Sequence, residues 1–178
     1  GENKLTELNG DGDFNSPECI ELLGESDIVV TNPPFSKFRD YVKLLIDNDK
    51  NFIIIGHINA IKYSEIFPLI QHNKLWPGYE FNKTMEFIMP DEYKVEGKGY
   101  VDADGKKHGF VPGIAWFTNL DIKKRHEEMI LVKRYTPEEY PHFDNYNAIE
   151  VGKTKDIPLD YDGVMGVPIT FLADYNPD

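Results

Sequence analysis

A four-residue polar turn, Asn32-Pro33-Pro34-Phe35, carries the residue types best suited to chemistry in this chain. Two consecutive prolines fix two φ angles and remove two amide donors, so the turn is stiff and cannot merge into a strand or a helix. Asn32 supplies a hydrogen-bonding amide, and Phe35 supplies an aromatic ring at the tip of the turn. A rigid corner with these two groups is suited to holding a planar ligand.

The segments on either side of this turn define its setting. Mostly β-branched residues at 28–31 predict a short buried strand before it, and a second apolar run at 52–56 predicts another strand. Ser36 is placed to cap a helix between them, because apolar residues follow it at the spacing i, i+3, i+4, i+7. These residues are Phe38, Tyr41, Val42 and Leu45. Strand, helix, strand is typical of a βαβ unit in a parallel sheet, so the turn should lie at the carboxyl end of a strand.

The later part of the chain differs in character from this βαβ unit. Extended segments and hairpin turns predominate in its middle, so the sheet is expected to close with antiparallel strands. From Tyr135 onward, prolines and tyrosines dominate and predict loops with short strands. Later strands are expected at 85–89, 114–118, 129–132, 149–151 and 168–172, with a turn at 102–105. The predicted fold class is α/β, with a parallel βαβ core closed by antiparallel strands.

Before the first predicted strand, Ser16 is a favourable N-cap and Pro17 suits the first helical position. A short helix is therefore expected to begin there and to stop at Gly24. The polar, glycine-rich residues 9–13 predict a turn ahead of this helix.

The composition limits the classes of protein to consider. Thirty-one acidic and 19 basic residues give a net charge of −12, which lowers the expectation of nucleic-acid binding without excluding a local basic surface. The single cysteine, Cys19, excludes an internal disulfide and suits a reducing compartment. We expect no membrane span, no secretion signal and a cytoplasmic setting. The five histidines form no pair at metal-ligand spacing, so no metal site is predicted.

The tetrapeptide at 32–35, directly after an apolar strand, resembles the catalytic tetrapeptide of amino-methyltransferases that use S-adenosylmethionine. The wider sequence resembles the EcoRI-type adenine-specific DNA methyltransferases, a similarity that extends over nearly all of the chain. The segments that carry it are Gly12-Asp13-Phe14, Ser16-Pro17-Glu18-Cys19-Ile20, residues 27–38, residues 113–119 and residues 165–172.

This resemblance implies a Rossmann-like methyltransferase sheet and transfer of a methyl group to N6 of an adenine flipped out of double-stranded DNA. Residues 1–134 would form the catalytic half of the methyltransferase domain, and residues 135–178 a loop-rich tail that could start a DNA-recognition region. Asp13 and Phe14 would lie near the adenine ring of the cofactor, although an aspartate that caps a helix is the alternative. The implied setting is the bacterial cytoplasm, with a restriction endonuclease as a genetic partner only.

The residue types also have a physical rationale. The exocyclic amine of adenine is a poor nucleophile because its lone pair is delocalised into the ring. Two acceptors for its protons, the Asn32 side-chain oxygen and the Pro33 carbonyl, would favour a localised lone pair. Pro34 would stiffen the turn, and Phe35 would stack on the extruded base. Such a reaction needs no metal, but it does need an open hollow beside Asn32 and Phe35.

Two family features are missing from the sequence. A complete enzyme of this class carries a glycine-rich turn after its first strand and an acidic residue after its second, which hold the methionine and ribose parts of the cofactor. This chain has neither, so we expect a fragment, truncated at the amino end and at the carboxyl end. It would contain the base-binding half of the site and be inactive alone.

One basic cluster includes Lys123, Lys124 and Arg125. It is either a solvated face or a set of contacts to DNA phosphates. Two alternatives to a DNA methyltransferase also stay open, because the same tetrapeptide serves enzymes that methylate RNA or protein glutamine, and a truncated domain could be an inactive nucleic-acid-binding module.

Overall fold

The computed structural model describes residues 7–178 and divides the chain into two compact units. The first unit comprises Gly1–Trp76 and Gly113–Leu120, and the second comprises Pro77–Pro112 and Asp121–Asp178. The boundary expected between residues 134 and 135 remains a prediction.

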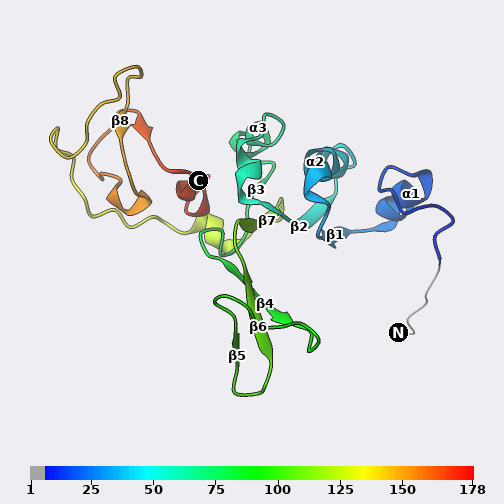
Figure 1. Cartoon of the computed structure of the whole chain (residues 1–178). Helices are drawn as coiled ribbons and strands as arrows, with labels where there is room; N and C mark the ends of the chain where they lie inside the picture. Colours follow the sequence, from blue (N-terminus) through cyan, green and yellow to red (C-terminus); the bar gives the residue numbers. More distant parts are fainter. Residues whose placement is uncertain (1–6) are drawn as a thin grey trace. The chain divides into compact units, whose positions relative to one another are not determined.

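The first unit contains a four-stranded sheet in the order β1-β2-β7-β3. Strands β1 (Ile28–Thr31) and β2 (Asn51–His57) are parallel and are joined by helix α2 (Phe38–Asp47), which confirms the predicted βαβ unit. Strand β7 (Ile114–Thr118) pairs with β2 in the antiparallel sense, as expected. The shorter elements are β3 (Trp76–Pro77), η1 (Phe35–Lys37), η2 (Ile58–Lys62) and α3 (Phe67–Gln71). Figure 1 shows α2 and α3 on the same side of this sheet, which covers that side with helices.

Helix α2 is fixed to the sheet by an apolar stripe that matches the predicted spacing. Phe38, Val42 and Leu45 are buried, and the Phe38 ring packs edge-on against Phe117 of β7 with centroids 5.2 Å apart. Gly56 of β2 makes room for this ring, because a Cβ at that position would lie 2.4 Å from Phe38 Cε2. The helix therefore fits closely against β2 directly after the polar turn.

The predicted cap at Ser36 is wrong. The 3₁₀ turn η1 occupies Phe35–Lys37, so α2 begins at Phe38 and Lys37 takes the N-cap position without a side-chain hydrogen bond. The cause is the second proline. The Lys37 N–H donates to the Pro34 carbonyl at 2.9 Å and tightens the chain before the helix starts.

Strand β1 is not buried on both faces, contrary to the prediction. Ile28 is 47% exposed and Val30 is 65% exposed, whereas Val29 and Thr31 on the other face are half-buried. Within residues 7–178, β1 pairs only with β2 and forms the edge of the sheet. An apolar run signals that a strand can be covered on both faces, but it does not supply the element that covers it.

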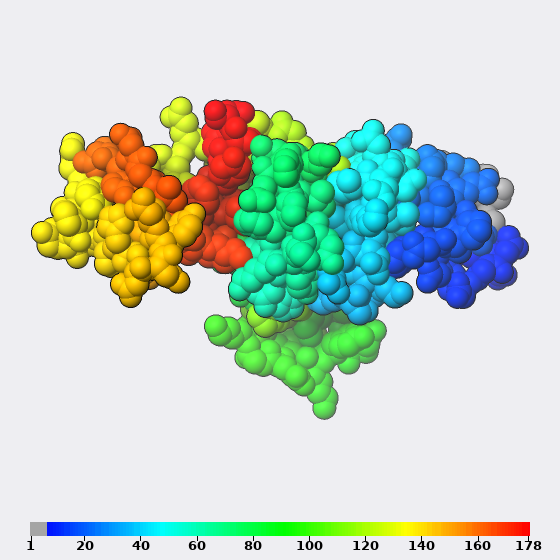
Figure 2. Space-filling view, turned by 90° about the horizontal axis from the view of Figure 1, so that it is seen from above, coloured from blue at the N-terminus to red at the C-terminus, as the bar shows by residue number. Residues whose placement is uncertain are grey.

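The segment before β1 folds as predicted and approaches α2. Helix α1 (Pro17–Glu25) has Ser16 as its N-cap, which accepts a hydrogen bond from the Cys19 N–H, and it ends one residue beyond Gly24. The Glu18 carboxylate accepts hydrogen bonds from the backbone N–H groups of Asn9 and Gly10, so it secures the preceding loop. The dark blue loop and α1 lie beside the lighter blue α2 in Figures 1 and 2.

The second unit contains a three-stranded antiparallel sheet and a loop-rich tail. The sheet has the order β4-β6-β5 and includes the predicted turn at 102–105. The tail encloses a small core of Tyr140, Ile149, Val151 and Ile157. The elements are β4 (Met85–Met89), β5 (Tyr100–Val101), β6 (Lys107–Val111), η3 (Lys123–His126), β8 (Ile149–Glu150), η4 (Thr154–Asp156), β9 (Met165–Gly166) and η5 (Ile169–Ala173). No helix in the described part of the chain is long and apolar enough to cross a membrane.

Two strands predicted in the second unit are wrong. Residues 129–132 form no strand, and Ile130 and Val132 are 87% and 73% exposed, because no neighbouring segment pairs with them within the described chain. Residues expected to extend from Pro168 instead form the 3₁₀ turn η5, in which the Phe171 N–H donates to the Pro168 carbonyl. In both places, apolar residues are present but no partner strand pairs with them within the described chain.

Candidate functional site

A pocket of about 430 Å³ lies in the first unit, beside the polar turn that follows β1. This volume is within the range of small-molecule sites. Three parts of the chain line the pocket: the loop before α1, the end of β1 with its turn, and the start of α2. The lining residues are Asp11, Gly12, Asp13, Phe14, Thr31, Asn32, Pro33, Pro34, Lys37 and Tyr41.

The proline turn presents its amide to this pocket. Asn32 is exposed, and its side chain has no hydrogen-bond partner within residues 7–178, so its carbonyl oxygen is available to a ligand. Pro33 is buried and Pro34 is exposed, and both line the pocket. Phe35 is 44% exposed but does not belong to the lining residues. The hollow expected beside Asn32 and Phe35 therefore adjoins Asn32, but Phe35 is not among the residues that line it.

The structure brings Asp13 and Phe14 to the same pocket as Asn32. Asp13 Oδ1 accepts a hydrogen bond from the Asn15 N–H at 2.8 Å, and its backbone carbonyl accepts one from the Ser16 N–H. Asp13 does not cap α1, whose N-cap is Ser16, so the alternative interpretation is wrong in that form. Its hydrogen bonds stabilise the turn just before the helix, and Asp13 also lines the pocket. Gly12 precedes it with a φ of +78°, a conformation that favours glycine.

Two pocket residues, Tyr41 and Lys37, were not predicted as part of the site. The Tyr41 ring packs edge-on against Phe14, with centroids 5.0 Å apart and planes at 83°. This contact joins α2 to the loop before α1. Burial, followed by the nearby Cys19, raises the pKa of Tyr41, so its hydroxyl stays protonated and can donate a hydrogen bond. The helical period had assigned Tyr41 only to the buried face.

A second, mainly apolar hollow of about 260 Å³ is formed by the same wall of the first unit. It shares Gly12, Phe14 and Tyr41 with the larger pocket and continues between α1 and α2. Its other lining residues are Cys19, Leu22, Leu23, Ser26, Val29 and Leu44. The Phe14–Tyr41 pair thus lines both hollows.

The basic cluster at 123–125 lies in the second unit, on the short turn η3. Lys123 is exposed, whereas the Lys124 ammonium lies 3.7 Å from an Asp174 carboxylate oxygen. Arg125 is half-buried, and burial lowers the pKa of its guanidinium. Lys124 is thus close to a carboxylate and Arg125 is partly buried, so only Lys123 of the three is exposed. The contact of this cluster with DNA remains a prediction.

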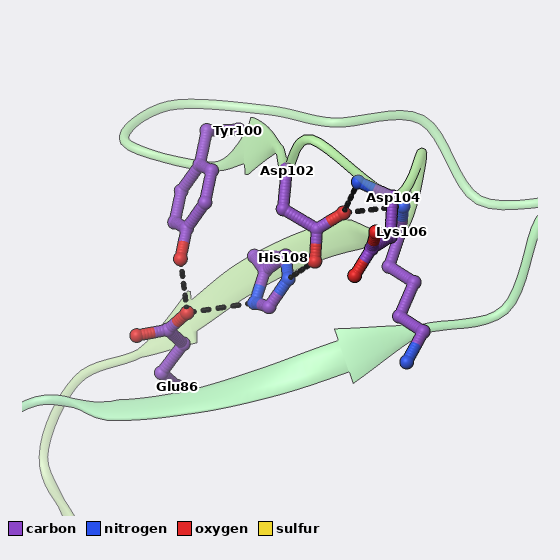
Figure 3. Close-up of polar contacts among 6 residues, drawn as sticks. All are labelled: Glu86, Tyr100, Asp102, Asp104, Lys106 and His108. Atoms are coloured by element: carbon purple, nitrogen blue, oxygen red, sulfur yellow. Dashed lines mark hydrogen bonds and ion pairs between the residues drawn. The ribbon is translucent and has the colours of Figure 1, made fainter.

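The second unit also contains a hydrogen-bonded cluster around His108 that no local sequence pattern predicts. The two ring nitrogens of His108 contact two carboxylates, with Nε2 at 2.9 Å from Asp102 and Nδ1 at 2.7 Å from Glu86 (Figure 3). The Tyr100 hydroxyl donates to the same Glu86 carboxylate at 2.7 Å, and its ring stacks on His108. Both ring nitrogens must carry a proton to donate to both carboxylates, so this geometry favours imidazolium.

The pKa of His108 is expected to lie above its ordinary value of 6.5, because Asp102 first and then Glu86 stabilise the charged ring. A raised pKa stabilises the β4-β6-β5 sheet fully below pH 6.5, and this contribution is lost as the pH rises through the raised value. The titration of the His108 Cε1 proton by NMR, with amide exchange of Tyr100 and Val101, would measure both effects.

The Asp102→Asn variant provides the control, since removal of the main partner should lower the His108 midpoint. The same hydrogen bond lowers the pKa of Asp102, so its contribution to stability is lost as the pH falls through that lowered value. A His108 midpoint at or below 6.5 in the unmodified protein would contradict this interpretation.

The described residues contain no group of three or more histidine, cysteine or acidic side chains suited to a metal ion.

Fold and site together define an α/β protein with a pocket at the carboxyl end of a parallel strand, lined by an unpaired amide on a proline turn, an aromatic residue and an acidic residue. The chain belongs to the family described as "Adenine-specific methyltransferase EcoRI", whose sequence model matches residues 2–178. The family suggested by the tetrapeptide and its flanking segments is thereby confirmed.

Three curated relatives support this assignment. The chain is 51% identical over 173 residues to "Type II methyltransferase M.EcoRI" of Escherichia coli. This alignment covers 95% of this chain and 53% of the relative. It is 46% identical over 175 residues to "Type II methyltransferase M.MpnI" of Mycoplasma pneumoniae, covering 96% and 55%. It is 45% identical over 179 residues to "Type II methyltransferase M.MgeORF184P" of Mycoplasma genitalium, covering 97% and 56%. The chain thus spans about half the length of these relatives, and no solved structure matches it.

Proposed function

We propose that this chain is the catalytic part of a site-specific DNA adenine-N6 methyltransferase that uses S-adenosylmethionine. The observation that carries the proposal is the single pocket shared by Asn32, Pro33 and Pro34 with Asp13 and Phe14. Family membership supports the reaction class, and the names of the relatives support a type II methyltransferase. A Rossmann-like methyltransferase sheet is part of the same proposal.

The donor set of the pocket fits part of S-adenosylmethionine. Asp13 offers a carboxylate as a hydrogen-bond acceptor, and Phe14 and Tyr41 offer aromatic surface for an adenine ring. When bound, this cofactor supplies a methyl group on a positively charged sulfur. The groups that hold its methionine and ribose parts in related enzymes have no counterpart in the sequence of this chain. Asp13 and Phe14 are therefore assigned to the adenine end alone.

The proline turn acts on the nucleophile. The Asn32 carbonyl oxygen and the Pro33 backbone carbonyl accept the two N6 protons of the adenine, which favours a localised lone pair on nitrogen. With Asp13 and Phe14 holding its adenine end, S-adenosylmethionine would supply the methyl group to this nitrogen, while the Asn32 and Pro33 oxygens would keep the N6 protons in place. Pro34 keeps the turn and its two acceptor oxygens in one orientation because its φ angle is fixed.

The decisive experiment measures the methyl acceptor. The protein at its full natural length is incubated with tritiated S-adenosylmethionine and whole-genome-amplified bacterial DNA, which carries no methylation. Label in N6-methyladenine at one sequence supports the proposal. Label that enters RNA or a protein glutamine instead supports the alternative substrates, and DNA binding without transfer supports an inactive binding module.

Phe35 is expected to stack on the extruded base, because its ring is 44% exposed next to Asn32. The Phe35→Ala variant should weaken DNA use by about 1–3 kcal/mol, the typical value of one base–aromatic contact. Steady-state kinetics with the same DNA would show this as a lower kcat/KM. Phe35→Tyr retains the ring and should restore most of the activity, whereas equal activity of Phe35→Ala and the unmodified protein would contradict the stacking role.

DNA contact in the second unit is assigned to Lys123, Lys124 and Arg125. Lys123 is the best placed of the three to bind a phosphate, because it is exposed, whereas Lys124 already contacts Asp174. Neutralising the three residues at full length should weaken DNA binding and lower its salt dependence. Unchanged binding would remove this role.

The proposed setting is the cytoplasm of a bacterium, since the relatives are bacterial and a single cysteine suits a reducing compartment. A cognate restriction endonuclease is proposed as a genetic partner, without any contact between the two proteins.

A further inference from the structure

Lys37 is the cationic residue that lines the pocket containing Asn32. It is exposed, and within residues 7–178 no acidic side chain pairs with its ammonium group. It follows Pro34 at the end of η1, so the same stiff turn that aims Asn32 also fixes the backbone of Lys37.

Other cations of α2 are engaged within the protein. The Arg39 guanidinium contacts Glu65 at 3.3 Å, and Lys43 pairs with Asp47 one helical turn further on. Lys37 differs from both because its charge is available to a ligand at the pocket.

The charge of Lys37 matters because the other charged residues that line the pocket are acidic. Asp11 and Asp13 line the same pocket, and the whole chain carries a net charge of −12. Phosphates of an approaching DNA strand would be repelled by this excess of negative charge. A free ammonium at the pocket counters that repulsion locally and can donate charge-assisted hydrogen bonds to phosphate oxygens.

The burial of the lining residues indicates which part of a nucleotide Lys37 would meet. Pro33 is the buried residue among those that line the pocket, whereas Lys37, like Asn32, is exposed to solvent. An adenine whose amine reaches the Asn32 and Pro33 carbonyls leaves its sugar and phosphates toward solvent. Lys37 is exposed and lines the same pocket, so its ammonium group is accessible to a phosphate there.

We propose that Lys37 binds a backbone phosphate that flanks the extruded adenosine. This inference rests on the proposed function and adds a phosphate contact to the base-binding site. The residue acts on substrate binding and takes no part in bond formation.

The test compares Lys37→Gln with the unmodified protein at full natural length, using amplified bacterial DNA as the methyl acceptor. We expect the KM for DNA to rise about tenfold at low salt, as for loss of one charge-assisted hydrogen bond. The slope of log(kcat/KM) against log[salt] should become less steep by about 0.9, since one phosphate contact is lost. The KM for S-adenosylmethionine should stay the same.

Lys43→Gln is the matched control, because it removes one lysine charge from the same helix where Asp47 already pairs with it. It should leave the KM for DNA and the salt slope unchanged, and Lys37→Arg should retain most of the DNA affinity. An unchanged KM and slope in Lys37→Gln would overturn the proposal. A higher KM for S-adenosylmethionine alone would also overturn it, by assigning Lys37 to the carboxylate of the cofactor.

These outcomes differ from a failure of the proposed function. If the unmodified protein transfers no methyl group to DNA, the function is wrong and the Lys37 assignment falls with it. If the unmodified protein is active and Lys37→Gln behaves identically, only the Lys37 assignment is wrong.

Discussion

In the protein at its full natural length, and on the proposed function, replacing Asn32 with alanine is expected to lower kcat for methyl transfer to DNA by about 10²–10³-fold. This is the usual loss when one preorganised polar group is removed from a transition-state site. The Asn32 amide has no partner within residues 7–178, so its removal leaves no protein group unpaired and the fold should persist. Because localisation of the amine lone pair increases toward the transition state, kcat and kcat/KM should fall together. Tritium transfer under steady-state conditions would measure both constants.

Asn51→Ala is a suitable control for this variant. Asn51 is an exposed amide at the amino end of β2, the opposite end of the strand from the pocket edge of the sheet. Its replacement should leave kcat and the circular dichroism spectrum unchanged. Full activity of Asn32→Ala would show that the proline turn does not act on the amine, and the catalytic assignment would have to be abandoned.

Replacing Phe38 with alanine is expected to reduce the free energy of unfolding by about 3–5 kcal/mol, as for other fully buried phenylalanines. Phe38 is 1% exposed, and its ring fills the space between Gly56 and Phe117. The cavity would lie one residue after η1, so the turn carrying Asn32 would also lose its support. Urea denaturation followed by circular dichroism would measure the loss of stability.

Phe35→Ala is the matched control for stability, because it removes the same side chain three residues earlier where the ring is 44% exposed. It should change the free energy of unfolding by about 1 kcal/mol or less. Replacing Phe35 is thus expected to lower activity with little effect on stability, whereas replacing Phe38 is expected to lower the free energy of unfolding. Comparable destabilisation by the two variants would contradict the assignment of Phe38 to the core and Phe35 to the site.

Local sequence signals predicted the elements that carry the turn. The spacing of Phe38, Val42 and Leu45 predicted the buried face of α2, and Ser16 with Pro17 predicted the start of α1. Such signals succeed because capping and helical periodicity depend on residues a few positions apart. The βαβ unit followed from the order of these elements.

Contacts between distant segments could not be predicted in the same way. The approach of Phe14 to Tyr41 joins residues 27 positions apart along the chain, and no local spacing encodes it. Tyr41 belongs to the apolar face of α2 and also lines the pocket. The helical spacing predicted its place on the apolar face but not its place at the pocket. Residues 129–132 failed for a related reason, since a strand requires a partner that the segment itself does not specify.

The edge position of β1 has a practical consequence for work with this chain. Its outer backbone groups have no strand partner within residues 7–178, and Ile28 and Val30 present hydrocarbon on one face. An unpaired edge strand with exposed apolar residues can pair with the same strand of another molecule, which favours aggregation in concentrated samples. Light scattering across a dilution series would therefore measure self-association of the protein. The Val30→Lys variant, which places a charge on the exposed face of β1, should reduce it.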